Sequence, residues 1–149
     1  MDKFDSLEKV YSLFQNVNCI GNDNCFFVVY KDTQKTSGFV GGMQHPYDAL
    51  LINLTENGLG YYYLKQSGVP MMYHIDKMDV LLDSFTFIKN ENIKSIIISK
   101  YALFNKGKKR ITIKLNDGMT HYLFANVDEK LIPYHNDNFL KFTSKFEIK

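Results

Sequence analysis

The chain has 149 residues, of which 45% are hydrophobic and 15% aromatic, although Trp is absent. This length suits one domain with a single core, and the supply of Tyr and Phe excludes extensive disorder. Eighteen basic residues stand against 16 acidic ones, and the net charge of +2 excludes a chain-wide field that attracts nucleic acid or membrane. We therefore expect a single domain over residues 1–149, in which any basic site is local.

The N-terminus and the cysteines indicate where the protein resides. The first nine residues mix acidic and basic side chains, where a secretory signal needs an uninterrupted apolar run. Cys19 and Cys25 have a spacing that fits neither a CxxC redox pair nor a zinc site. No stretch reaches the length of a bilayer-spanning helix. These features predict a cytoplasmic protein with two free thiols.

The N-terminal part of the chain predicts a helix followed by a strand. Apolar residues at three- and four-residue steps predict an amphipathic helix over residues 3–15. The Asn- and Gly-rich segment 16–24 ends this helix, and the β-branched and aromatic run 25–30 predicts a buried strand. Residues 31–44 then form a polar connection that contains glycine. Antiparallel strands are expected within residues 25–126.

The clearest hairpin signal lies in residues 49–64. Asn57-Gly58 supplies the two positive φ angles of a type I′ turn, so a two-residue loop is predicted there. That loop places Leu54 opposite Tyr61 and separates an apolar face of the hairpin from a mixed one.

The C-terminal half predicts further strands and a closing helix. Residues 70–84 fit a helical stripe and a strand equally well, so both interpretations stay open. Strand patterns follow at residues 85–88, 93–99, 110–115 and 119–125. Beyond Pro133, three phenylalanines at helical spacing predict a helix over residues 135–146, capped by Asn136 or Asn138. The ringed face of this helix, formed by Phe139, Phe142 and Phe146, is expected to close one end of the sheet.

Four motifs follow one another from residue 49 onward. An apolar strand ends in Leu-Thr-Glu-Asn-Gly at 54–58, and Asn-Ile-Lys-Ser-Ile at 92–96, Lys-Arg-Ile-Thr-Ile at 109–113 and Asp117-Gly118 precede the closing helix. In this order they resemble the bacterial pleckstrin-homology-like (PH-like) domains, over about two thirds of the chain. The resemblance implies an α+β fold: a bent antiparallel β-barrel with a C-terminal capping helix, here with an extra N-terminal helix. The basic cluster does not lie in the first hairpin, where phosphoinositide-binding members carry theirs.

The strongest charge cluster consists of Lys106, Lys108, Lys109 and Arg110. Strand alternation places Lys108 and Arg110 on one face and the following isoleucines on the other. Several cations on one solvent face make a candidate anion site, and the planar guanidinium of Arg110 suits phosphate. The alternative is a solubilising hairpin whose lysines protect a sheet edge. Because exposed charges contribute little to stability, replacement of Lys108 and Arg110 is expected to leave folding unaffected.

Other polar residues show no motif that demands catalysis. The glycine-rich segment 38–42 lacks the ending of a phosphate-binding loop, and the four histidines are scattered. Carboxylates at 76, 79 and 83 share one face only if their segment is helical. We therefore expect neither a metal nor a cofactor. The apolar rim around Phe39 and Tyr47 is a candidate contact for a protein partner.

These observations favour a non-catalytic binding or scaffolding module, with a protein partner preferred over an anionic membrane surface. A homo-oligomer is also open. One alternative is a small hydrolase or transferase whose acids and histidines converge near the loop from Gly38 to Tyr47. A weaker alternative is binding of single-stranded nucleic acid by the tyrosines at 61–63 together with the lysine-rich hairpin, but the near-neutral charge argues against nucleic acid.

Overall fold

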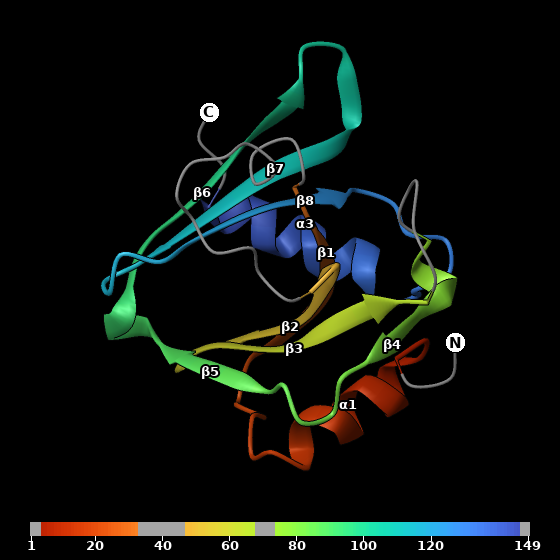
Figure 1. The fold of residues 1–149 in the computed structure, drawn as a ribbon, viewed down its shortest axis with the longest axis vertical. Helices are drawn as coiled ribbons and strands as arrows, with labels where there is room; N and C mark the ends of the chain where they lie inside the picture. Colours follow the sequence, from red (N-terminus) through yellow and green to blue (C-terminus); the bar gives the residue numbers. More distant parts are fainter. Residues whose placement is uncertain (1–3, 33–46, 68–73, 147–149) are drawn as a thin grey trace.

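The computed structural model describes residues 4–32, 47–67 and 74–146 (Figure 1). In chain order the elements are α1 (Leu7–Gln15), β1 (Asn24–Lys31), β2 (Ala49–Thr55), β3 (Gly58–Gln66), η1 (Ile75–Lys77), β4 (Met78–Val80), β5 (Thr86–Lys89), η2 (Asn90–Asn92), β6 (Ile93–Ala102), β7 (Asn105–Leu115), β8 (Thr120–Asn126) and α3 (His135–Phe146). Within these ranges, no helix is long and apolar enough to cross a membrane.

The eight strands form one antiparallel sheet that stays open. Its order is β4-β3-β2-β1-β8-β7-β6, and β5 pairs with β3 beside β4. Among the described residues no ladder joins β6 to β4 or β5, so the expected barrel is not closed by pairing. After β5 the chain passes through η2 into β6, and β6 pairs with β7 instead of with β3. The predicted antiparallel sheet with one helix at each end of the chain is confirmed.

The central strands β1 and β2 are buried on both faces. On one face α3 covers a core that includes Phe27, Ile52 and Ile111. On the other, α1 covers a second core that includes Phe14 and Tyr62. All seven residues of β2 are therefore buried, and the face of the 49–64 hairpin that the sequence predicted as mixed is internal as well.

Helix α1 begins later than the apolar pattern predicted. The Ser6 hydroxyl accepts the N–H of Lys9 at 3.3 Å and caps the helix, so that Leu7 is its first residue. Val10 and Phe14 are fully buried, and the Tyr62 hydroxyl donates to the carbonyl of Leu13 at 2.6 Å. The helix is thus fixed to β3 both by its apolar stripe and by one hydrogen bond.

The turn between β2 and β3 lies one residue earlier than predicted, which shifts the strand pairing by two residues. Thr55 pairs with Gly58 and Leu54 with Leu59, so Glu56 and Asn57 form the loop. Gly58, not Asn57, has the positive φ, at 158°. A shift of two residues keeps each side chain on its predicted face, because strand side chains alternate with a period of two. The face assignment therefore survives, although the predicted register was wrong.

The sequence left the secondary structure of residues 70–84 open, and the structure describes residues 74–84 of this segment. A single 3-10 turn, η1, leads into the short strand β4, whose Val80 pairs with Leu64 of β3. Asp76, Asp79 and Asp83 all lie on the surface, but the segment is not a helix that gathers them on one face.

Helix α3 supplies hydrogen bonds to β1 and β8 where these two strands stop pairing with each other. These two strands pair only at Tyr30–Phe124 and at the next residue pair. Beyond that point His135 bridges them, because its Nδ1 accepts the N–H of Val28 at 3.1 Å and its Nε2 donates to the carbonyl of Asn126 at 2.7 Å. Asn138 continues the row by donating to the carbonyl of Phe26. Asn138 and Asn136 thus lie inside a helix that begins at His135, instead of capping it as predicted.

The buried aromatic face of α3 leads to a prediction about stability. Phe139 and Phe142 are 1% and 2% exposed, and the ring of Phe142 lies 4.5 Å from that of Phe27. We expect Phe142→Ala to lower the free energy of unfolding by about 3–5 kcal/mol, through lost apolar burial and a residual cavity. Leu140→Ala, at a position 61% exposed on the same helix, is the control and should change it by less than about 0.5 kcal/mol. Chemical denaturation measures both, and similar shifts would contradict the assigned helix face.

His135 predicts a pH dependence of stability. Burial lowers its pKa from 6.5 to about 4 in the folded protein. Between these values the unfolded chain binds a proton that the folded chain does not, so stability rises with pH. This contribution is fully present above about pH 6.5 and is lost as pH falls toward 4, by at most about 1.4 kcal/mol per pH unit.

The matched comparison is His135→Gln, which removes the titration while keeping an acceptor and a donor. Unfolding by denaturant at several pH values should show a shallower slope for this variant, whereas His74→Gln, at an exposed position, should keep the wild-type slope. Equal slopes in all three proteins would show that His135 does not control acid sensitivity.

Candidate functional site

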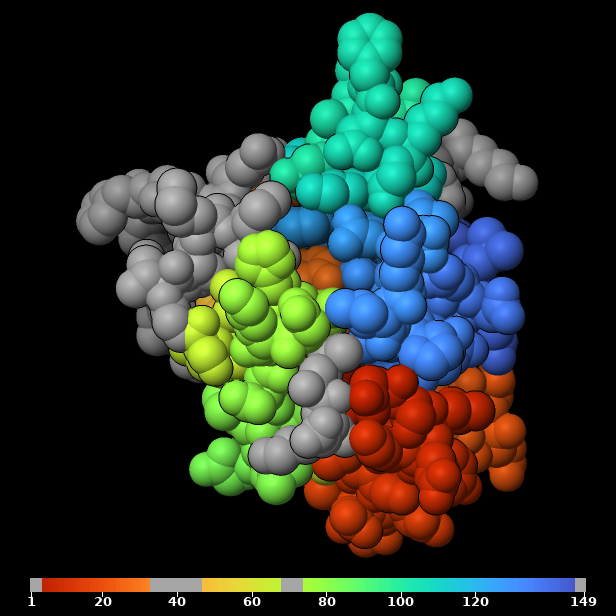
Figure 2. Space-filling model, turned by 90° about the vertical axis from the view of Figure 1, so that its right-hand side faces the viewer, coloured from red at the N-terminus to blue at the C-terminus, as the bar shows by residue number. Residues whose placement is uncertain are grey.

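The β6–β7 hairpin projects from one end of the molecule (Figures 1 and 2). Strand β8 pairs with β7 from Lys114 only as far as Lys108, and one further bond joins the N–H of Val127 to the carbonyl of Gly107. Among the described residues, the tip beyond Gly107 therefore has two strands and no third one paired beside them. This distal ribbon, residues 102–107, contributes no side chain to either core.

The tip of the hairpin carries two adjacent large apolar side chains. Leu103 is 76% exposed and Phe104 is 91% exposed, more than any other large hydrophobic residue in the described part of the chain. They occupy the connection between Ala102 and Asn105, which pair with each other across the ribbon. Neither core accounts for them, and sequence reasoning missed them because two apolar residues in a strand-rich segment look like core material.

The four cations predicted as an anion site all lie on this hairpin, but they do not share one face. The Nζ atom of Lys108 lies 5.3 Å from the ring centroid of Tyr101 and 5.1 Å from that of Phe124. Lys109 faces the opposite side, where it is the register partner of Lys100. Lys106 is exposed beside the tip. The alternation predicted for β7 is confirmed, because Ile111 and the other odd-numbered residues that follow are buried.

Arg110 has a structural partner. Its Nε donates to Oδ2 of Asp32 at 2.8 Å, and its guanidinium lies 5.1 Å from the ring centroid of Tyr101. The Asp32 side chain is 1% exposed at the end of β1, and its backbone N–H donates to the carbonyl of Tyr122. Arg110 therefore joins the base of the hairpin to β1, and its guanidinium is already engaged with a carboxylate.

A row of rings continues from the hairpin into the second core. Phe124 lies 5.3 Å from Tyr101 and, stacked, 5.3 Å from Tyr30. The Tyr30 hydroxyl donates to the carboxylate of Glu129, which also accepts from the side chain of Asn126. Burial raises the pKa of Glu129, although both hydrogen bonds act in the opposite direction. Burial likewise raises the pKa of Tyr30. The row anchors the hairpin to the sheet.

The two residues predicted to contact a protein partner are Phe39 and Tyr47, and the described residues show no surface formed by them. Tyr47 is fully buried, and its hydroxyl lies 2.8 Å from Nδ1 of His121, so it is a core residue and not a surface anchor. Phe39 lies outside the described residues, as does nearly all of the loop from Gly38 to Tyr47. Of the three tyrosines proposed to stack on bases, Tyr61 and Tyr62 are buried and Tyr63 is half-buried.

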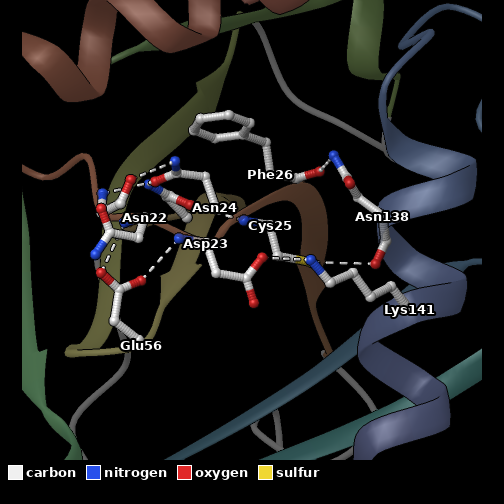
Figure 3. Close-up of polar contacts among 10 residues, drawn as sticks. Asn22, Asp23, Asn24, Cys25, Phe26, Glu56, Asn138 and Lys141 are labelled. Carbon is white, nitrogen blue, oxygen red and sulfur yellow. Dashed lines mark hydrogen bonds and ion pairs between the residues drawn. The ribbon is translucent and has the colours of Figure 1, made fainter.

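A second polar cluster joins the loop before β1 to α3 and to the β2–β3 turn (Figure 3). The Glu56 carboxylate accepts the backbone N–H groups of Asn22 at 2.7 Å and Asp23 at 2.9 Å, and these bonds lower the pKa of Glu56. On the other side Lys141 pairs with Asp23 at 2.6 Å. A Cβ at Gly21 would lie 2.5 Å from the Glu56 carboxylate and would have to displace it. The polar groups of this cluster satisfy one another, so it holds the loop.

The cysteines and histidines do not form a reactive or metal-binding site among the described residues. Burial raises the pKa of Cys19 and Cys25 to about 11, so both thiols stay protonated and unreactive near neutral pH. Among the described residues, no group of three His, Cys, Asp or Glu side chains is placed to hold a metal ion. His45 lies outside the described residues, and His74 is exposed.

The contact between Arg110 and Asp32 corrects an expectation and generates a prediction. Replacement of Arg110 removes the charge partner of a buried carboxylate, so folding will not be unaffected. We expect Arg110→Gln to lower the free energy of unfolding by about 2–4 kcal/mol, less than for a fully buried pair because 19% of the Arg110 side chain is exposed. Lys114→Gln removes an exposed charge from the same strand and should change it by less than about 0.5 kcal/mol. Equal urea midpoints for both variants would contradict a structural role.

Comparisons with protein-family models, with curated proteins and with solved structures found no match to this chain. The resemblance to PH-like domains therefore stays a prediction. The function is inferred below from the geometry of the hairpin and from the distribution of charge along the chain.

Proposed function

We propose that this protein is a non-catalytic binding module that docks through the tip of its β6–β7 hairpin. The observation that carries the proposal is the exposure of Phe104 and Leu103 at the end of a projecting ribbon. Large apolar groups gathered at a protruding surface are typical of interaction sites, and a ring that enters a partner contributes much of the binding energy. The rest of the fold then acts as the rigid support for this tip.

The environment of the buried titratable groups supports a binding role over a catalytic one. His135 bridges two strands through both ring nitrogens, and Glu129 is held by Tyr30 and Asn126. Each of these groups has a perturbed pKa whose main cause is burial within the framework. Perturbed groups of an active site normally face a cleft where substrate can reach them.

The strand order supports membership of the PH-like family. Strands β1–β5 and β6–β8 form two successive antiparallel units, joined through β1 and β8, and α3 lies over the face between them. This arrangement fits the bent, helix-capped sheet that the resemblance implies. Fold alone does not assign a ligand, so the binding role rests on the hairpin.

The hairpin also defines what a partner must offer. It has to receive two neighbouring apolar side chains and to tolerate the lysines that flank them. An acidic protein surface with an apolar pocket meets both conditions, which agrees with the preference for a protein partner drawn from the sequence. An anionic bilayer meets them too.

A site-specific photo-crosslinker tests the proposal without assuming the class of partner. The protein carrying a benzophenone amino acid at position 104 should yield adducts with protein or lipid when irradiated in its native cells. The matched control carries the same group at Phe87, which is 40% exposed on β5. Adducts that form at position 104 and disappear when Leu103 is replaced by Ser would support docking through the tip. Equal labelling at positions 104 and 87 would contradict it.

A further inference from the structure

We propose that the surface on which the hairpin docks is an anionic lipid bilayer, into which Leu103 and Phe104 insert below the head groups. This inference rests on the proposed docking role of the hairpin and names the class of surface. It is carried by the distribution of charge, by the placement of cations around the ribbon, and by the reach of the tip.

The near-neutral net charge of the chain hides a strong segregation of charge. Residues 92–116, which contain the whole hairpin, hold six lysines and one arginine and no Asp or Glu. The rest of the chain holds 11 basic and 16 acidic residues. Arg110 pairs with Asp32 at the hairpin base. The hairpin is thus a cationic projection on an acidic body, and its charge is complementary to an anionic surface.

The cations surround the hairpin instead of covering one side of it. Lys108 and Arg110 lie on one face of β7, whereas Lys109 lies on the other face, directly opposite Lys100 of β6. Cations therefore lie on both faces of the hairpin. A protein surface presents its acidic groups to one side of a docked hairpin, whereas a head-group layer surrounds an inserted one. The two-faced arrangement favours the bilayer.

The length of the distal ribbon fits the thickness of the head-group layer. From Lys108, the last β7 residue paired with β8, to Phe104 the strand advances about 13 Å. The polar layer of one leaflet is about 5–8 Å thick, given the difference between total and hydrocarbon thickness. The tip therefore reaches the hydrocarbon boundary while the rest of the sheet remains in water. Lys106 then lies at the depth of the phosphates, where long basic side chains are favoured, and Lys100, the partner of Lys109, lies just outside the head-group layer and faces the anionic surface.

The absence of Trp from the chain permits a direct test. Phe104→Trp places a single indole at the tip, and Leu82→Trp places one at an exposed site on the acidic body as the control. Each protein is mixed with vesicles of phosphatidylcholine alone or of phosphatidylcholine and phosphatidylglycerol in equal parts. We expect a blue shift and quenching by brominated acyl chains only for the Phe104→Trp protein with the anionic vesicles, and raised salt should reverse both.

Charge and tip variants separate the two contributions. Vesicle co-sedimentation of Lys100→Gln with Lys106→Gln should be weaker by about tenfold or more, since each lysine near an anionic surface contributes several-fold. Lys77→Gln with Lys89→Gln changes the total charge equally on exposed sites of the body and should keep wild-type binding. Leu103→Ser with Phe104→Ser should lose insertion. Thermal unfolding of every variant should match wild type, because all these side chains are exposed.

The outcomes distinguish this inference from the proposed function. Wild-type protein that ignores anionic vesicles at low salt, or binding without a spectral change in the Phe104→Trp protein, overturns insertion. If adducts at position 104 are then proteins alone, the docking role stands and a protein partner replaces the bilayer. If vesicle binding and position-specific adducts are both absent, both proposals fail. Equal loss in the hairpin and body lysine variants would show only unspecific charge attraction and would also overturn the inference.

Discussion

One histidine holds the two halves of the sheet together. Strands β1 and β8 share only two residue pairs before they diverge, and a diverging pair leaves backbone donors and acceptors that must be satisfied inside the core. His135 serves the N–H of Val28 with one ring nitrogen and the carbonyl of Asn126 with the other. Its ring also stacks on Phe139 at 5.2 Å, so the same residue positions α3 against the core. The join between the two halves of the sheet and the position of α3 against the core both involve this residue.

Charge and apolar surface are distributed in opposite ways over the body and the hairpin. The body encloses most of its large side chains in two cores and carries an excess of carboxylates, whereas the hairpin carries cations alone and exposes Leu103 and Phe104, the two most exposed large apolar side chains of the described residues. Rings beneath the hairpin, from Tyr101 to Tyr30, connect its base to the second core. Arg110 adds a charged tie to Asp32. The tip is thus held rigidly from below while its own side chains face outward, as recognition elements on a stable scaffold are.

Sequence reasoning predicted the elements better than their partners. Alternation along β7 and the helical spacing of Phe139 and Phe142 report which face is buried, and both predictions are confirmed. The β2–β3 register failed because the Glu56 carboxylate binds the backbone at residues 22 and 23, a contact across more than 30 positions that no local turn signal contains. The guanidinium of Arg110 was predicted to be available to an anion because its contact with Asp32 is also distant in the sequence. The exposed tip was missed for two reasons. A net charge near zero conceals the concentration of cations in the hairpin. The exposure of the tip follows from the end of β8 pairing at Lys108, which the sequence does not show.

The end of β8 pairing at Lys108 divides the molecule into a part that must fold and a part that can vary. Residues 102–107 contribute no side chain to the buried members of either core, so their sequence is under little constraint from packing. A ribbon of two strands is marginal by itself and is ordered here by the sheet from which it grows. The same body can therefore present different tips over evolutionary time, and the hairpin is a natural graft point at which new binding specificity can be installed without redesign of the core.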